Sequence, residues 1–240
     1  MDSTLPQPPA NRTPEPPAER DVKHVRGKRG LIWLLGGGAI VICGLVSLNH
    51  AIFRPQRVAH DRAEAINHLL SVGCSLMEFD SEYGSFPNAA TAAEVKSNTG
   101  TALTLGDRSS NQLFRQLIAV GLKSEKPFWA KTGISPKKPD DIYGTDATAL
   151  VAGEVGFAYI SGLSTATHPE CPLAMTPLLP GRRTFDTKPF AGKAIVLFTD
   201  NSTVVLDIDK HGRAILNGMD LFDVRQPFWG GEAPDIKWAE

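Results

Sequence analysis

The chain has 240 residues, of which 42% are hydrophobic and 21% charged, and its formal net charge is -1. These values are typical of one globular domain or two small ones. The balanced charge argues against a nucleic-acid-binding protein, which needs a basic surface to displace phosphate counterions. With only three cysteines, the chain is not a small disulfide-rich scaffold either.

The first 30 residues form a proline-rich segment. They contain 6 of the 18 prolines and no phenylalanine, tyrosine or tryptophan. Proline and the lack of large apolar side chains favour extended, solvated backbone. We therefore predict a disordered tail over residues 1–30. Two roles remain open for it, a solubilising leader and a docking peptide for a cytoplasmic partner.

An apolar run without charged residues follows from Leu31 to Phe53. As a helix it rises about 1.5 Å per residue, which is enough to cross a hydrocarbon core of about 30 Å. We predict one transmembrane helix over residues 31–53, in contact with the lipid bilayer. A cleaved secretory signal is the alternative, but the run is longer than a typical signal and no good cleavage site follows it.

Basic residues flank this run on both sides and predict its orientation. They are more crowded before the run than after it, and the positive-inside rule then places the N-terminus in the cytoplasm. The preceding group is Lys23, Arg26, Lys28 and Arg29, and the following group is Arg54, Arg57 and Arg62.

A second helical pattern begins after Pro55. Apolar residues recur there at spacings of three and four, namely Ile66, Leu69, Leu70, Gly73, Leu76 and Met77. This spacing predicts an amphipathic helix from about Gln56 to Asp80. It should end before Gly84, which can adopt a left-handed cap, and Pro87, which cannot continue a helix. If Pro55 only kinks the chain, the span and this helix are continuous.

Two shorter helices are expected next. Residues 89–97 follow Asn88 as a candidate N-cap, and residues 112–120 follow a polar segment, Ser109 to Asn111, and stop at Gly121. Beyond residue 153 the pattern predicts strands at 155–160, 173–176, 194–198, 203–208 and 213–216, with tight turns at 200–201 and 209–212. The expected fold of residues 54–240 is an α+β domain in which an antiparallel meander packs against the long N-terminal helix.

Three segments carry a resemblance to a known family. The long helix leads into Phe-Asp-Ser-Glu-Tyr-Gly-Ser-Phe-Pro at 79–87, a hairpin of the form Leu-Phe-Thr-Asp-Asn lies at 197–201, and the chain closes with Trp-Gly-Gly and Asp-Ile-Lys-Trp within 229–238. Together they resemble the type II secretion pseudopilins and the wider family of type IV pilin-like proteins, from about Gly30 to the end of the chain. The segment at 79–87 is the most specific of the three.

The resemblance implies a pilin-like fold, other pilin-like subunits or secretion-machine components as partners, and a bacterial inner-membrane protein with its main domain in the periplasm. It also implies a processing site between Gly30 and Leu31. The family carries glutamate at the fifth position of its apolar run, whereas this chain carries Leu35. The charge pairing between neighbouring subunits that this glutamate provides in the family is therefore not expected here.

Three places in the chain carry possible metal ligands. Asp-Ile-Asp-Lys-His-Gly at 207–212 begins like a calcium loop, but Gly218 stands where the bidentate glutamate belongs, which predicts an exposed turn. The resemblance implies a structural calcium near the C-terminal loop, for which the candidates are Asp220, Asp223 and Asp235. The run His-Pro-Glu-Cys at 168–171 lacks a second ligand pair, which favours a surface loop over a zinc site.

Two cysteines and a group of aromatic residues are further candidates for a structural or binding role. Cys74 and Cys171 both lie outside the predicted span, and in an oxidising compartment they are candidates for a disulfide. An aromatic group near the C-terminus is either part of a core or an exposed binding surface, with the core favoured. Its members are Phe222, Phe228, Trp229 and Trp238.

No pattern in the chain indicates catalysis. Ser161 and Ser164 lack the Gly-x-Ser-x-Gly context of a hydrolase nucleophile, and no phosphate-binding glycine loop follows a strand. We therefore expect a non-enzymatic protein without a cofactor, apart from the candidate calcium. The leading hypothesis is a pseudopilin-like subunit or accessory of a type II secretion or pilus-like assembly. The alternatives are an anchored binding module for peptide or glycan and an unrecognised envelope enzyme.

Overall fold

The computed structural model describes the backbone of residues 26–240 and the side chains of residues 55–240. Most of the predicted tail, the predicted span 31–53 and the candidate processing site at Gly30 and Leu31 lie outside the residues described with their side chains. Among residues 55–240, no helix is long and apolar enough to cross a bilayer. The chain divides into two units, Met1–Ile52 and Phe53–Glu240, and the second is the α+β domain described below.

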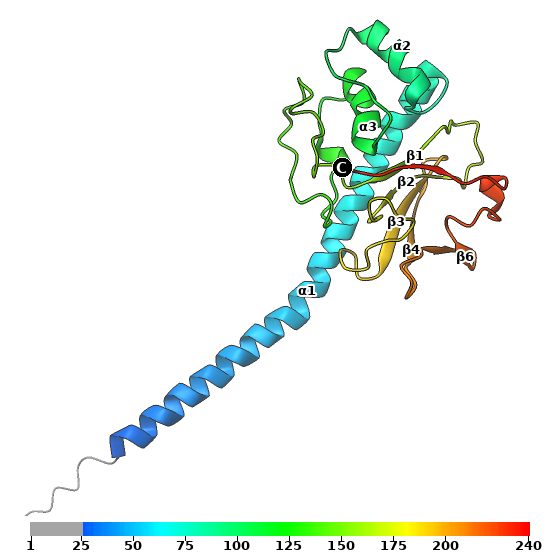
Figure 1. The fold of residues 1–240 in the computed structure, drawn as a ribbon. Helices are drawn as coiled ribbons and strands as arrows, with labels where there is room; N and C mark the ends of the chain where they lie inside the picture. The colour runs from blue at the N-terminus through cyan, green and yellow to red at the C-terminus, as the bar shows by residue number, and fades with distance from the viewer. Residues whose placement is uncertain (1–25) are drawn as a thin grey trace, which may run out of the picture. The chain divides into compact units, whose positions relative to one another are not determined.

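Helix α1 (Arg26–Tyr83) is the longest described helix, and its C-terminal part belongs to the domain (Figure 1). From Ala65 onward one face is buried, and it carries Leu69, Val72, Leu76 and Phe79. The helix ends at Tyr83 because Gly84 adopts a φ of 73° and donates its N–H to the Asp80 carbonyl at 2.7 Å. The predicted glycine cap is confirmed, and the helix ends three residues later than expected.

Two short helices follow, α2 (Ala89–Thr99) and α3 (Ser110–Ala119). Asn88 caps α2 in a capping box, in which its side chain accepts the Thr91 N–H and the Thr91 hydroxyl accepts the Asn88 N–H. Ser109 caps α3 by accepting a backbone N–H from the first turn. Both helices and the cap at Asn88 are therefore confirmed. Ser109 is the one of three candidate residues that caps α3, because a polar N-cap side chain replaces the backbone partners that a helix start lacks, and α3 begins two residues earlier than expected.

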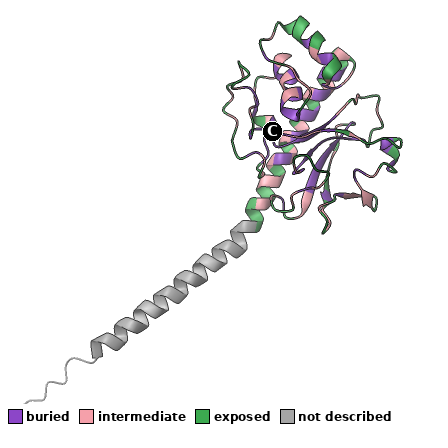
Figure 2. Ribbon diagram, in the orientation of Figure 1, coloured by how far each residue is buried: buried purple, intermediate pink, exposed green. Residues whose placement is uncertain are grey.

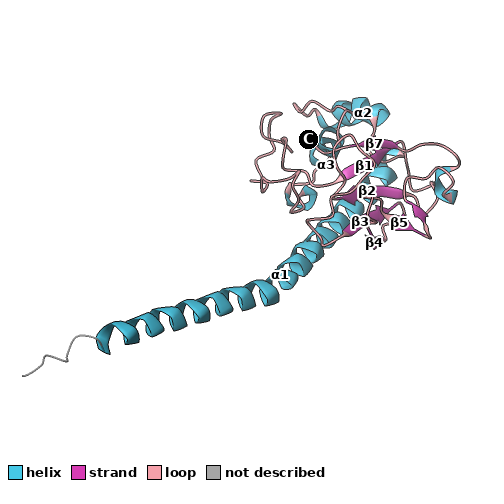
Figure 3. Cartoon of the chain, turned by 60° about the horizontal axis from the view of Figure 1, so that its bottom comes forward, coloured by secondary structure: helices cyan, strands magenta, loops and turns pink. Residues whose placement is uncertain are grey.

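The main sheet is antiparallel and has the strand order β4-β3-β2-β1-β7. The predicted meander is confirmed for the first four strands, whereas β7 pairs with the outer edge of β1 and was not predicted. The predicted strand at 213–216 is reduced to β5, labelled in Figure 3, and β5 pairs with β6 in a separate two-stranded sheet. The bounds are β1 Ala158–Ser161, β2 Pro172–Thr176, β3 Lys193–Phe198, β4 Thr203–Asp207, β5 Ile215–Leu216, β6 Met219–Asp220 and β7 Asp235–Lys237.

The two faces of the main sheet belong to two hydrophobic cores, because side chains alternate along a strand. In β3, Ile195 and Leu197 face the core that contains α1, while Val196 and Phe198 face the second core. The strands of the sheet are largely buried (Figure 2). The second core includes Phe222, Phe228 and Trp229, so the core interpretation of this aromatic group is confirmed for these three residues. Trp238 is half-buried, and its indole N–H donates to the Arg182 carbonyl at 2.9 Å.

The turn between β3 and β4 packs directly on α1. Asn201 occupies this turn with a φ of 64°, a left-handed conformation that asparagine tolerates. Its side-chain oxygen lies so close to Gly73 that a Cβ atom at position 73 would meet it at 2.0 Å. Glycine at this point of the helix therefore allows the hairpin to approach the helix backbone.

Candidate functional site

One side of α1, next to its core face, carries a line of apolar and small residues, here called the outer stripe. Its members recur at spacings of three and four, which aligns them along one side of the helix, roughly 120° from the core face. Three of them are exposed, namely Ala59, Ala63 and Cys74, and three are half-buried, namely Ile66, Leu70 and Met77. The sequence pattern predicted the last three on the same face as Leu69 and Leu76. Ile66 and Met77 do pack against the edge of that core, whereas Leu70 is not part of it.

Serines next to the outer stripe direct their hydroxyls back to the helix. Ser71 donates to the Asn67 carbonyl at 3.0 Å, and Ser81 donates to the Met77 carbonyl at 2.9 Å. These hydroxyls are satisfied within α1 and need no partner from outside. The arrangement offers a surface on which another helix can pack, and small side chains at Ala59 and Ala63 allow close approach.

The two cysteines outside the predicted span, which were candidates for a disulfide, are free thiols in the structure. Cys74 is exposed on the outer stripe, where it accepts the Asn201 amide N–H at 3.6 Å. Cys171 is buried in the second core, on the sheet face opposite α1, and burial raises the pKa of its thiol to about 12. The sheet separates the two sulfur atoms, which is why the pair does not meet.

The three calcium candidates are each engaged in a local contact. Asp220 accepts the backbone N–H of Phe222 at 3.0 Å, Asp223 pairs with Arg225 at 2.6 Å, and Asp235 pairs with Lys237 at 3.1 Å. Hydrogen bonds from Arg225 lower the pKa of Asp223 to about 2. Within residues 55–240, no three His, Cys, Asp or Glu side chains gather in a way that could hold a metal ion.

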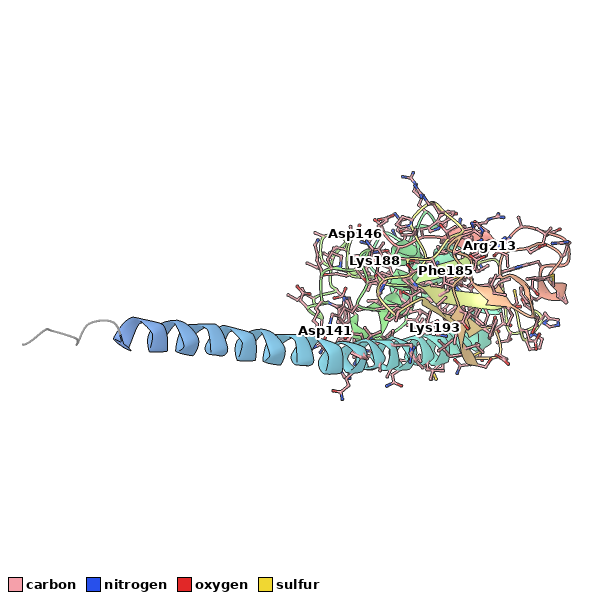
Figure 4. The ribbon with its side chains drawn as sticks, turned by 90° about the horizontal axis from the view of Figure 1, so that it is seen from below. Asp141, Asp146, Phe185, Lys188, Lys193 and Arg213 are labelled. Carbon is pink, nitrogen blue, oxygen red and sulfur yellow. The ribbon has the colours of Figure 1, made fainter. Side chains whose placement is uncertain are left out.

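The calcium-like run at 207–212 forms the predicted turn. Asp209 accepts the backbone N–H groups of His211 and Arg213, and its second oxygen accepts the Arg213 guanidinium at 2.7 Å. Asp207 pairs instead with Lys193, labelled in Figure 4. Each carboxylate of the run therefore contacts a neighbouring cation or backbone group, and the two carboxylates do not form a common calcium site.

The residues considered for zinc and for nucleophilic catalysis also lie apart. His168 and Glu170 belong to a turn, in which the His168 carbonyl accepts the Cys171 N–H at 2.9 Å. Ser161 ends β1, and Ser164 lies in the following turn, where its hydroxyl accepts the N–H of Ala166. No hydrogen bond among the described residues joins either serine to a histidine.

Glu125 was missed in the sequence and is the most perturbed carboxyl in the described part of the chain. It is fully buried; one oxygen accepts the Leu150 N–H at 2.6 Å, and the other is buried without a partner. Burial raises its pKa to about 7, and the neighbouring Glu154 adds to the effect. The sequence around it, Lys-Ser-Glu-Lys, is typical of a solvated segment and carries no signal of burial.

Two clefts are lined in part by residues of α1 outside the outer stripe. One of about 150 Å³ lies beside His68, whose Nδ1 donates to the Trp129 carbonyl at 2.7 Å, while Lys138 stands over the Trp129 ring at 5.1 Å. The other, of about 240 Å³, lies between α1 and α3. Glu78 and Glu82 line the second cleft together with apolar side chains, which gives it an acidic rim.

Comparison with models of known protein families, with curated proteins and with solved structures finds no match to this chain.

Proposed function

We propose that the chain is a non-enzymatic, single-pass inner-membrane protein that serves as a pilin-like subunit or accessory of a type II secretion or pilus-like assembly. The observation that carries the proposal is the outer stripe of α1. It begins at Ala59, only six residues after the uncharged run ends at Phe53, so one helix carries both a candidate span and a candidate packing surface.

Packing between helices explains the composition of the outer stripe. Alanine and cysteine at 59, 63 and 74 leave room for a neighbouring backbone, while Ile66, Leu70 and Met77 supply apolar contacts. Because Leu35 replaces the glutamate of the pilin-like families, contact between subunits depends in this proposal on apolar packing along α1. Charge pairing within the span has no part in it.

Cys74 allows a direct test, because its exposed thiol lies on the outer stripe. Cys43→Ser removes the thiol inside the predicted span, so the full-length variant retains only Cys74 and the buried Cys171. Mild oxidation of this variant in membranes should give a disulfide-linked dimer, and the further substitution Cys74→Ser should abolish it. Moving the thiol to exposed α2 provides the matched control, Cys74→Ser with Lys96→Cys, which should remain monomeric. Equal dimer yields from positions 74 and 96 would contradict packing through the outer stripe.

The N-terminus separates an assembling subunit from a permanent anchor. A mass measurement on the native protein should find a chain that begins at Leu31 and carries an N-methyl group if it is processed as a pilin. An intact Met1 would count against processing, although an unprocessed accessory would still give the Cys74 dimer.

The cleft between α1 and α3 favours the second candidate function, an anchored binding module. Its acidic rim of Glu78 and Glu82 over the apolar side chains of Phe79 and Leu117 suits a peptide with basic and apolar residues. This alternative predicts a monomer in the Cys74 experiment and binding of basic peptides that Glu78→Gln with Glu82→Gln weakens.

A further inference from the structure

A shallow groove lies between the first described turns of α1 and the loop that leads into β3. It has a volume of about 410 Å³, and it is lined by Pro55, Val58, Ala59, Arg62, Lys188 and Ala191. Its floor is apolar and two of its lining residues are cations. We propose that this groove binds the headgroup of an anionic phospholipid, an inference that rests on the proposed function because it takes residues 31–53 as the membrane span.

The loop side of the groove is held firmly. Phe190 is fully buried in the core that contains α1, which fixes the loop against the helix. The loop is closed by the Gly192 N–H, which donates to the Thr187 carbonyl at 2.8 Å. The Gly192 carbonyl in turn accepts the Ile208 N–H at 2.9 Å, next to the end of β4. Lys188 and Ala191 therefore have a defined position beside α1, and a ligand that binds there does not have to order the loop.

The two cations of the groove are not neutralised. Among the residues described with side chains, neither Arg62 nor Lys188, labelled in Figure 4, forms an ion pair. The neighbouring Asp61 is paired with Lys131 at 2.9 Å. Asp186 directs one oxygen to the backbone N–H of Lys188 at 2.9 Å. The groove therefore presents two positive charges to a ligand.

The groove lies at the end of the candidate span. Pro55 follows Phe53 by two residues, so it lies within about 7 Å of the end of the uncharged run however the chain is arranged. Arg62 lies further along the helix, but side chains of a helix lean toward its N-terminus, and a long arginine can extend its charge toward the interface. Each headgroup layer is about 5–8 Å thick. A bilayer that holds residues 31–53 therefore brings its headgroups to this groove.

The chemistry of the groove fits a phosphate joined to an apolar body. Arginine offers a planar pair of donors to phosphate oxygens and lysine offers a point charge. Pro55 and Val58 can contact the glycerol and upper acyl carbons. A second copy of this chain is a poorer occupant in a symmetric contact, because two identical cationic grooves repel each other. Zwitterionic lipids neutralise their own phosphate, which favours an anionic lipid such as phosphatidylglycerol.

Photo-crosslinking in nanodiscs tests the proposal with the full-length chain. The nanodiscs contain phosphatidylcholine and a minor fraction of phosphatidylglycerol that carries a photoactivatable headgroup, and mass spectrometry locates the labelled residues. We expect label at 55–62 and 187–193. Arg62→Gln with Lys188→Gln should lower this label about fivefold or more, since one cation near an anionic membrane surface contributes roughly that factor in binding.

The matched control removes two positive charges that are far along the chain from the groove, one in α2 and one just before α3. Lys96→Gln with Arg108→Gln changes exposed residues near α2, and it should leave the label unchanged. Equal label in both double variants, or equal label from a phosphatidylcholine probe, would overturn the proposal. Protection by free glycerol 3-phosphate at millimolar concentration would also overturn it, because it would indicate a site for a soluble phosphate.

The failure of this inference can be told apart from the failure of the proposed function. If alkaline carbonate releases the chain from membranes, the membrane anchoring fails and the lipid site fails with it. If the chain stays in the membrane, forms the Cys74 dimer and shows evenly spread label, only the lipid site fails.

Discussion

The two faces of the main sheet are covered in different ways. Helix α1 covers one face with residues at regular spacings of three and four, such as Leu69, Val72 and Leu76. Loops and short strands after β4 cover the other face, and their aromatic side chains come from separate segments, such as Phe185, Phe222 and Trp229. One core is therefore built by a repeating pattern, and the other by the meeting of irregular segments.

The two sides also differ in their carboxyl groups. On the α1 side, burial raises the pKa values of Glu125 and Glu154, while hydrogen bonds lower the pKa values of the exposed or half-buried Asp141 and Asp146. On the other side, hydrogen bonds from arginines lower the pKa values of Asp209 and Asp223 to about 2. The stability that Glu125 and Glu154 contribute should therefore be lost as pH rises, whereas Asp209 and Asp223 are ionised at neutral pH and lose their pairing only in strong acid.

The largest expected effect sharpens the contrast in packing. Phe79→Ala removes a ring that is 1% exposed and stacks on Tyr83 with a centroid distance of 4.5 Å. Loss of this ring should lower the free energy of unfolding by about 3–5 kcal/mol. Chemical denaturation of the full-length chain in detergent, followed by tryptophan fluorescence, measures the change. The matched control is Val224→Ala on an exposed residue of the other side, which should change stability by less than about 0.5 kcal/mol.

The pH dependence comes next in size. The folded-state pKa of Glu125 is about 7, above its ordinary value of 4.5, so the folded state holds the proton more tightly than the unfolded state. The stabilisation is complete below about pH 4.5 and is lost as pH rises toward 7, a change of about 1–3 kcal/mol. Glu125→Gln should flatten this part of the curve and raise stability at pH 8.

Denaturation midpoints of the parent and of Glu125→Gln, measured between pH 5 and 8, test whether Glu125 causes the loss of stability. Asp223→Asn serves as the control, because its carboxylate is already ionised throughout this range. If the parent and Glu125→Gln lose the same stability between pH 5 and 8, Glu125 is not the source of the pH dependence, and the expected difference between the two sides is wrong.

The smallest effect is expected on the other face. The Trp229 indole N–H donates to the Leu221 carbonyl at 2.8 Å within the second core. Trp229→Phe keeps an aromatic ring but leaves this carbonyl without its partner, which should lower the free energy of unfolding by about 1–2 kcal/mol. Trp238→Phe, which removes a hydrogen bond at a more exposed site, should cost less. A larger loss from Trp238→Phe would mean that the second core depends on its edge more than on its centre.

Local signals explain which parts of the fold could be predicted. The end of α1 at Gly84, the N-cap at Asn88 and the turn at Asn201 each depend on the backbone chemistry of one residue, and all three are confirmed. Strand β7 could not be predicted, because three residues between Pro234 and Trp238 carry no periodic pattern. Its place is determined by pairing with β1 across a long stretch of chain.

The candidate site was predictable only in outline. The helical spacing from Ile66 to Met77 indicated an amphipathic helix, but it did not separate the residues that face the sheet from the outer stripe, because both recur at three and four. Lys188 joins the groove through the buried Phe190, a tertiary contact without a local signal. Glu125 is buried by distant loop segments around Leu150, which no pattern near residue 125 indicates.

The contact between Gly73 and Asn201 links the composition of α1 to that of the β3–β4 turn. A Cβ atom at position 73 has no room while the Asn201 side chain is present, and glycine is the residue that can replace asparagine at a φ of 64° without strain. A chain that keeps this packing can therefore carry a side chain at only one of the two positions. In related sequences, a side chain at position 73 should therefore occur together with glycine at position 201. Such a pair of compensating substitutions would reveal this fold where overall identity is low.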